Sequence, residues 1–285
     1  MDYREWEWRS ADGTRLFACG WRPEEPGRTK GVVGIVHGMG EHSGRYAHVA
    51  EMLTDEGYAV LGFDQRGHGR TEGKRGHTPS YEALLEGMDL MLDEAARQYP
   101  GLPRFAYGHS MGGNVVLNYA LRREGRKLAG AIATGPWLRL AFRPPKMTLV
   151  AGRIMERFYP AFTNHRPLAA ERLTSDPDMA RRYADDKLGH GLITARFFFS
   201  IQRAGRWALE HADRLSIPLL LMHGGDDQVT SLAASRQFAE RAGPRCTFVE
   251  WPHFRHELHN ELERERVFSL VRRWLNTQTD GRKPG

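Results

Sequence analysis

The feature that most constrains the fold is a series of short apolar runs that do not alternate with polar residues. Residues 31–36 read Gly-Val-Val-Gly-Ile-Val, and comparable runs follow at residues 59–63, 105–107, 129–134, 217–222 and 247–250. A strand with one solvated face alternates in polarity, whereas a continuous apolar run is typical of a strand covered on both faces. The runs therefore predict the buried strands of a mostly parallel sheet.

Helical patterns lie between these runs. They cover residues 46–56, 81–97, 112–123, 231–242 and 261–275, with Ser80 expected as the N-cap of the second helix. Two alternating segments flank the turn Asp12-Gly13 and predict an opening hairpin of residues 4–9 and 15–22. Together the patterns predict an α/β fold, with helices on both faces of an eight-stranded sheet.

The alternation of strands and helices stops between residues 137 and 210. Apolar residues recur there at helical spacing (Met147, Val150, Ile154 and Phe158), and we find no buried-strand run. We expect a helical lid over the carboxyl end of the sheet, where open α/β sheets bind ligands. The alternative is a bulky crossover connection with its own small core. The predicted organisation is a core of residues 1–136 and 211–285 with a lid of residues 137–210.

Composition excludes several classes of protein. With 285 residues, 40% of them hydrophobic, the chain can bury a sizeable core. It contains no apolar run of about 18 residues, the length needed to span a bilayer. The first ten residues carry acids and tryptophans where a signal peptide would be basic and then apolar. We therefore expect a soluble, cytoplasmic protein.

The charge pattern argues against a nucleic-acid partner, and the cysteine content argues against disulfides and a cysteine-based zinc site. The formal net charge is +6, yet the sequence lacks the Lys/Arg runs and aromatic-basic motifs of nucleic-acid-binding proteins, so we expect no nucleic acid partner. The two cysteines, Cys19 and Cys246, are too far apart in sequence to suggest a disulfide framework or a Cys-based zinc site.

The strongest chemical signal is Gly108-His109-Ser110-Met111-Gly112, which fits the pattern Gly-x-Ser-x-Gly. It follows an expected strand and opens an expected helix, which is the context of a nucleophile elbow. A tight turn needs small residues beside the serine, and the start of a helix favours developing negative charge. The motif therefore predicts Ser110 as a catalytic nucleophile.

A serine nucleophile needs a base that is oriented by a third group. In this kind of fold the acid and then the histidine follow the serine along the chain. Asp226 and Asp227 both follow the run 217–222; we favour Asp227, which precedes the apolar Val229, and regard Asp226 as a turn residue.

Three histidines, His253, His256 and His259, follow the run 247–250. Their spacing could suggest a metal site, but Pro252 and the loop position argue against an aligned helix, so we expect no metal. We favour His256 as the base because it lies on the approach to the last helix.

A serine nucleophile that attacks a carbonyl group also needs main-chain N–H groups that bind the oxyanion of the tetrahedral intermediate. One is expected from Met111, the residue after the nucleophile, and the other from Met39 in the glycine-rich loop that follows residues 31–36. Glycines in that loop allow the backbone to approach the substrate closely.

With these motifs in place, the sequence resembles the monoacylglycerol lipase and lysophospholipase branch of the α/β-hydrolases. The most specific block is His37-Gly-Met-Gly-Glu-His-Ser-Gly-Arg-Tyr46; Phe63-Asp-Gln-Arg-Gly-His-Gly, the elbow and His256-Glu-Leu-His259-Asn-Glu261 follow in order. The resemblance implies an α/β-hydrolase fold, a single-chain lipid ester as substrate and no cofactor. It assigns Ser110, Asp227 and His256 to the triad and Met39 and Met111 to the oxyanion hole.

The resemblance also implies a small polar pocket for the glycerol end of the substrate, lined by Glu41, Arg45, His109 and His259. For Glu41 and Arg45 the alternative is a purely structural ion pair. Other substrates remain open with the same residues, namely a lysophospholipid, a short-chain ester or a peptide. A non-catalytic binding protein of the same fold is the alternative from another class.

The net charge is concentrated in the expected lid. Residues 137–210 contain 13 Lys or Arg and 7 Asp or Glu, whereas the rest of the chain is neutral. A basic, partly apolar lid could dock on anionic lipid, which makes peripheral membrane contact a hypothesis; solvated helix faces are the alternative.

Overall fold

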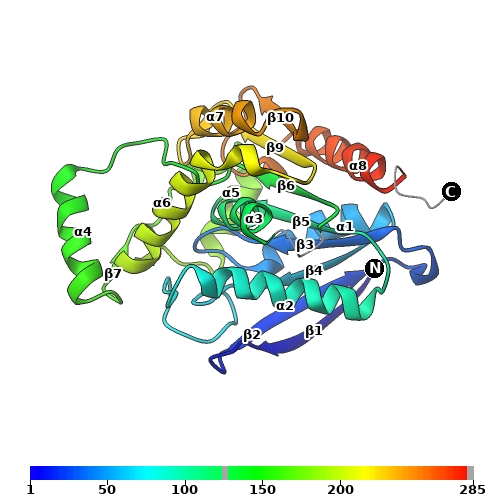
Figure 1. Ribbon diagram of the computed structural model, residues 1–285, viewed down its shortest axis with the longest axis horizontal. Helices are drawn as coiled ribbons and strands as arrows, with labels where there is room; N and C mark the ends of the chain where they lie inside the picture. Colours follow the sequence, from blue (N-terminus) through cyan, green and yellow to red (C-terminus); the bar gives the residue numbers. More distant parts are fainter. Residues whose placement is uncertain (124–127, 281–285) are drawn as a thin grey trace.

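Figure 1 shows the computed structural model of the chain, which describes residues 1–123 and 128–280. An eight-stranded sheet runs through it, and the order of its strands is β1-β2-β4-β3-β5-β6-β9-β10. The bounds are β1 (Asp2–Arg9), β2 (Arg15–Arg22), β3 (Gly31–Val36), β4 (Tyr58–Phe63), β5 (Arg104–His109), β6 (Gly130–Thr134), β9 (Leu219–Gly224) and β10 (Cys246–Trp251).

The sheet is parallel except at one edge. β1 and β2 form the expected hairpin, and β2 pairs antiparallel with β4, while β4, β3, β5, β6, β9 and β10 pair in parallel. Every residue of β3 is buried, and its side chains go alternately to two separate cores, Val32 and Val36 to one and Val33 and Ile35 to the other. The prediction of strands covered on both faces is confirmed for β3, β4, β6 and β9, all of whose residues are buried. It is wrong for β10, because this strand lies at the edge of the sheet and its residues before Trp251 are exposed or half-buried.

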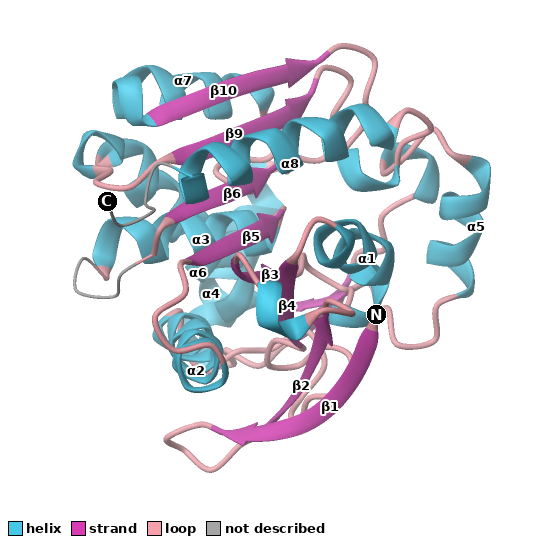
Figure 2. Ribbon diagram, turned by 90° about the vertical axis from the view of Figure 1, so that its right-hand side faces the viewer, coloured by secondary structure: helices cyan, strands magenta, loops and turns pink. Residues whose placement is uncertain are grey.

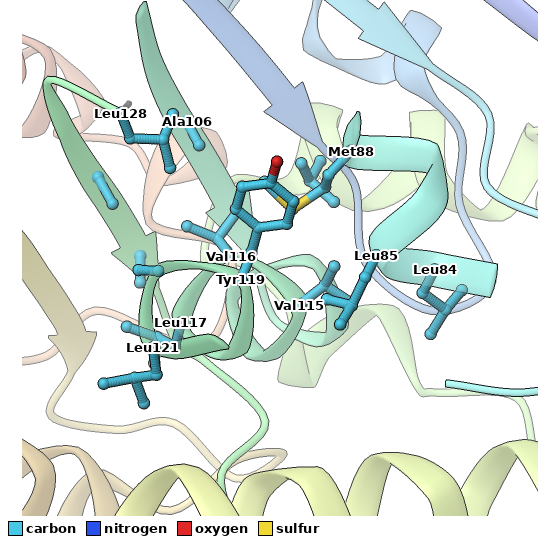
Figure 3. Close-up of a cluster of buried hydrophobic side chains, with 14 of the residues drawn as sticks. Leu84, Leu85, Met88, Ala106, Val115, Val116, Leu117, Tyr119, Leu121 and Leu128 are labelled. Atoms are coloured by element: carbon cyan, nitrogen blue, oxygen red, sulfur yellow. The ribbon is translucent and has the colours of Figure 1, made fainter. Parts of the chain in front are cut away.

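Helices cover the two faces. Residues of α2 (Glu82–Gln98), α3 (Met111–Arg122) and α7 (Leu232–Ala242) belong to one core, and residues of α1 (Ala47–Asp55) and α8 (Arg264–Asp280) to the other. Figure 2 shows α1 and α8 on the near side of the sheet. Figure 3 shows how α3 packs in the first core, with Val115, Val116 and Tyr119 between α2 and the sheet.

Two helix boundaries differ from the sequence predictions. α2 begins at Glu82, so Tyr81 rather than Ser80 flanks the helix, although the Ser80 hydroxyl still accepts a hydrogen bond from the Ala83 N–H at 3.2 Å. The last helix begins at Arg264 and not at residue 261, because a 3₁₀ turn over Leu258–Asn260 comes first and the Glu261 carboxylate binds main-chain groups.

The expected helical stretch, which we call the 137–210 block, contains α4 (Lys146–Phe158), α5 (Pro177–Asp185) and α6 (Ala195–Glu210). It also contains a two-stranded antiparallel sheet of β7 (Thr163–His165) and β8 (Leu192–Thr194), which was not predicted from the sequence. Strands of three residues are too short to produce a readable period. In Figure 1, α4 lies farther from the main sheet than α6.

Within residues 1–123 and 128–280, no helix combines the length and the apolar character needed to cross a membrane. The residues 281–285 at the end of the expected core lie outside the described part of the chain.

Candidate active site

Ser110 lies in a sharp turn between β5 and α3. Its φ of 53° and ψ of −113° are unusual for a residue with a side chain, and its N–H donates to the Thr134 carbonyl at 2.9 Å. A Cβ on Gly108 would overlap the Gly112 carbonyl, and one on Gly112 would overlap the Val36 carbonyl. Both glycines are therefore required by close backbone approach, as an elbow demands.

Asp227 and His256 form a buried pair at the ends of β9 and β10. The distance between His256 Nδ1 and Asp227 Oδ2 is 2.7 Å, and the side chains are 2% and 0% exposed. Because a carboxylate only accepts hydrogen bonds, Nδ1 carries the proton and Nε2 is left as the basic nitrogen. Burial by itself lowers the pKa of His256, but the charge of Asp227 outweighs it and raises the pKa above its ordinary value.

The Asp227 carboxylate is held by several donors. Oδ1 accepts from the N–H groups of Val229 and Thr230 at 2.7 and 2.9 Å, and His223 Nε2 lies 3.1 Å from Oδ2. Burial raises the pKa of Asp227, but the attraction of His256 and the bonds from His223 and His256 hold it well below the usual range. The fixed, ionised carboxylate can orient the imidazole of His256.

The competing residues from the sequence lie elsewhere. Asp226 is 60% exposed and faces His253, which is 92% exposed, at 3.9 Å. Neither of them reaches the buried pair. The geometry thus favours Asp227 over Asp226 and His256 over His253.

Two main-chain N–H groups near Ser110 are available. Those of Met39 and Met111 make no hydrogen bond to any other described residue. A Cβ on Gly38 would lie 3.2 Å from the Cβ of Ser110, so the loop after β3 is in contact with the elbow. The Gly38 N–H donates to Glu41 Oε1, which fixes this loop.

A buried polar cluster adjoins the serine. Arg45 Nη1 donates to Glu41 Oε2 at 2.6 Å, and its two terminal nitrogens contact the Glu257 oxygens at 3.0 and 2.9 Å. Asn260 Nδ2 donates to Glu257 Oε2 at 2.6 Å, and the Tyr46 hydroxyl donates to Glu41 Oε1 at 2.7 Å. Burial raises the pKa of Glu257, but the nearby Arg45 charge lowers it well below its usual range.

The two histidines expected in this cluster differ in position. His109 faces the cavity that contains Ser110, and burial together with the neighbouring His256 lowers its pKa to about 4. His259 is fully buried behind it, with its ring 4.9 Å from those of His109 and Tyr46, and it does not line the cavity. The expectation that His259 contacts a ligand directly is therefore not met.

The serine opens into a cavity of about 500 Å³. Glu41, Arg45, His109, His256 and Glu257 form one end of its wall, and the 137–210 block supplies most of the apolar remainder: Leu149, Met155, Leu168, Ile193, Phe198 and Phe199. The site thus joins a charged end to an apolar chamber.

Among the residues of the site that sequence reasoning did not predict are Glu257 and His223. Glu257 follows the favoured histidine directly, but its partner Arg45 is 212 positions away, so nothing local indicated the pairing. His223 lies near the end of β9. The chain turns sharply after this strand, and the turn brings Asp227, four residues later, back to the His223 side chain. The one usable signal in the sequence was that Glu257 directly follows the candidate base His256.

A sequence model of the family described as serine aminopeptidase, S33, matches residues 27–263. The chain belongs to this family of serine hydrolases. The α/β-hydrolase fold expected from the motifs is confirmed.

Individual proteins that are similar to this chain are consistent with its membership of this family. The chain is 31% identical to the monoacylglycerol lipase of Mycolicibacterium smegmatis over 92% of its own length and 93% of the lipase. The crystal structure of monoacylglycerol lipase from Paleococcus ferrophilus superposes with a TM-score of 0.84 at 31% identity, covering 92% of this chain and 99% of that one. An abhydrolase domain-containing protein of Dictyostelium discoideum is 32% identical over 96% of this chain, which spans 29% of its length.

The buried pair generates a prediction about titration. In Asp227→Asn the attraction that raises the pKa of His256 is lost while burial, which lowers it, remains. We expect the pKa of His256 to fall by about 1 to 3 pH units, measured by NMR titration of the imidazole. The exposed Asp226→Asn is the control and should leave the pKa unchanged. An unaltered His256 pKa in Asp227→Asn would contradict the pairing.

Proposed function

We propose that the protein is a serine ester hydrolase that cleaves monoacylglycerols to a fatty acid and glycerol. The observation that carries the proposal is the position of Ser110 and His256, where a charged, buried cluster meets an apolar chamber. A monoacylglycerol is likewise divided into a polar and an apolar part, because its ester group joins a polyol to an alkyl chain. The monoacylglycerol lipase relatives support this choice of substrate.

In the first half of the proposed reaction, Ser110 Oγ attacks the ester carbonyl carbon and His256 Nε2 takes the hydroxyl proton. Asp227, bound to Nδ1–H, keeps the imidazole in the required tautomer and stabilises the imidazolium. The oxyanion accepts hydrogen bonds from the N–H groups of Met39 and Met111. The C–O bond to glycerol then breaks as His256 returns its proton to the leaving oxygen.

In the second half, a water molecule attacks the acyl group on Ser110. His256 removes a proton from that water, and the tetrahedral intermediate again places its charge at the Met39 and Met111 N–H groups. Collapse of the intermediate releases the fatty acid and returns the proton to Ser110. The cycle needs no group beyond the side chains and main chain described.

The glycerol hydroxyls would donate to the two carboxylates. An ionised carboxylate offers about four acceptor positions, and Glu41 uses three of them on Gly38, Tyr46 and Arg45. Glu257 likewise uses three, on Arg45 and Asn260. Each carboxylate therefore retains one position for a hydroxyl, while Arg45 mainly holds them in place. His109 completes this wall, and His259 supports it from behind.

We also propose that the 137–210 block is a lid. It supplies Leu149, Met155 and Phe198 to the cavity, so it would set the length of acyl chain that fits. The amino-terminal range 1–136 and the range from 211 onwards would then form the catalytic core. The main-chain bond from Ala141 N–H to the Val229 carbonyl, 3.0 Å, joins block and core beside Asp227.

A hydrolysis panel tests the substrate. Monoacylglycerols of graded chain length should exceed lysophosphatidylcholine, a short p-nitrophenyl ester and an aminoacyl arylamide in kcat/KM by at least about tenfold, since each lost set of contacts costs about 1–3 kcal/mol. Higher kcat/KM for the lysophospholipid or the arylamide would overturn the assignment of substrate.

Ser110→Ala is the control for the panel. It removes only the attacking hydroxyl, so turnover should fall by at least about 10⁴-fold while the thermal unfolding midpoint stays close to that of the wild type. Retained turnover in purified Ser110→Ala would instead contradict the mechanism.

We further propose that α4 brings the lid to a membrane surface that contains anionic lipid. Its cavity-facing side carries Leu149 and Met155, but Met147 and Phe158 on the outer side are 86% and 76% exposed. Val150 and Ile154 add to this outer stripe, and exposed basic residues accompany it: Arg143, Lys146 and Arg157. An exposed apolar stripe flanked by cations is typical of an interfacial helix.

Vesicle sedimentation tests this contact. Binding to vesicles with anionic lipid should exceed binding to neutral ones and weaken with salt, because each nearby cation contributes about 1 kcal/mol. Met147→Ser with Phe158→Ser should reduce binding by at least about fivefold, whereas Leu262→Ser, an exposed leucine outside the block, should not. Equal binding to neutral and anionic vesicles at all salt concentrations would count against the proposal.

A further inference from the structure

The loop that carries His256 is held on both sides of the histidine by groups tied to one short segment of the 137–210 block. The Glu257 N–H donates directly to the Leu173 carbonyl at 2.7 Å. The Arg255 N–H donates to Glu261 Oε1 at 2.6 Å. The two amides that flank the proposed base thus both have fixed partners.

The Glu261 carboxylate extends the second of these contacts into the same segment. Its other oxygen, Oε2, accepts from the Ser175 N–H at 3.0 Å and from the Ser175 hydroxyl. Glu261 is 2% exposed, so its bonds are sheltered from competition with water. One carboxylate therefore joins Arg255, next to His256, to Ser175 in the block.

Further contacts join the same two stretches. Thr174 Oγ1 donates to the Asn260 carbonyl at 2.6 Å, and Arg255 Nη1 donates to the Thr174 carbonyl at 2.8 Å. Asp176, which caps the start of α5, pairs with Arg264 at 3.0 Å. The connection is a continuous set of bonds over residues 173–176 and 255–264 rather than a single contact.

The opposite end of this segment reaches the cavity. Leu173, whose carbonyl holds the Glu257 amide, lines the cavity beside the polar cluster. His256 itself lies in a loop between β10 and the 3₁₀ turn Leu258–Asn260, so no helix or strand fixes its backbone. Hydrogen bonds from other segments to this loop must therefore fix the backbone position of His256.

We propose that residues 173–176 of the block, acting through Glu261, position His256 for catalysis. Glu261 is a positioning residue and does not touch the substrate. The inference rests on the proposed role of His256 as the base. It makes the block part of the machinery that orders the base, in addition to a wall of the cavity.

The test uses the rate of covalent labelling by a fluorophosphonate probe, a reaction that requires both Ser110 and its base. In Glu261→Gln the side chain keeps one acceptor oxygen in place of two. It can therefore accept from Arg255 or from Ser175 but not from both, and the connection between them is broken. The labelling rate constant should fall about 10- to 100-fold, because a small displacement of a catalytic group has effects of this size. For a monoacylglycerol, kcat should fall with KM changed by less than about twofold.

The labelling experiment separates positioning from stability. Loss of folded protein lowers the amplitude of labelling and the unfolding midpoint, whereas a displaced base lowers the rate constant of the molecules that remain folded. Glu263→Gln is the matched control, since Glu263 is exposed and, among the described residues, its side chain pairs with Arg266 alone. It should label at the wild-type rate.

Variants of Ser175 and the double variant test the link to the block. Ser175→Ala removes the hydroxyl donor and should slow labelling, while Asp178→Asn, exposed on α5, should not. Since Ser175 and Glu261 act through one contact, the double variant should be slower than Glu261→Gln by less than about twofold.

Two results would overturn the inference. One is wild-type labelling rates in both Glu261→Gln and Ser175→Ala; the other is a loss of amplitude and unfolding midpoint with unchanged rate constants. If His256→Ala labels as fast as the wild type, the proposed function itself fails, and that outcome is distinguishable from the other two.

Discussion

The site depends on the parallel pairing of β3, β5, β6, β9 and β10. Parallel strands end at the same edge of a sheet, so the loops that follow them meet there although they are far apart in sequence. Met39 follows β3, Ser110 follows β5, Asp227 follows β9 and His256 follows β10. The main-chain hydrogen bonds of the sheet therefore bring together the loops that carry the proposed machinery. The 137–210 block lines the apolar part of the cavity and supplies hydrogen bonds to the loop that carries His256.

Much of this arrangement could be predicted because it follows from local patterns. A strand buried on both faces must be apolar throughout, which made β3 recognisable, and the glycines around Ser110 are required by backbone contacts with Val36 and with each other. The placement of Asp227 and His256 followed from strand ends and from chain order. The family assignment, made from contiguous motifs, agrees with the comparisons.

Other features could not be read because they depend on long-range contacts. Arg45 faces both Glu41, four residues away, and Glu257, in a distant loop, and only the folded chain brings the second carboxylate to it. The late start of α8 reflects the use of Glu261 by Arg255 and Ser175. The apolar periodicity of α4 predicted a helix correctly, but Met147 and Phe158 point outward rather than into a core. Periodicity identifies an apolar face without saying what covers it.

The most direct measurement of the central claim is the location of the acyl group during turnover. An activated p-nitrophenyl ester acylates quickly relative to hydrolysis of the intermediate, so acid quenching within the burst should trap the acyl-enzyme. Peptide mass spectrometry should then find the acyl group on Ser110, with the burst absent in Ser110→Ala. An acyl group on another residue, or a full burst in Ser110→Ala, would contradict the account.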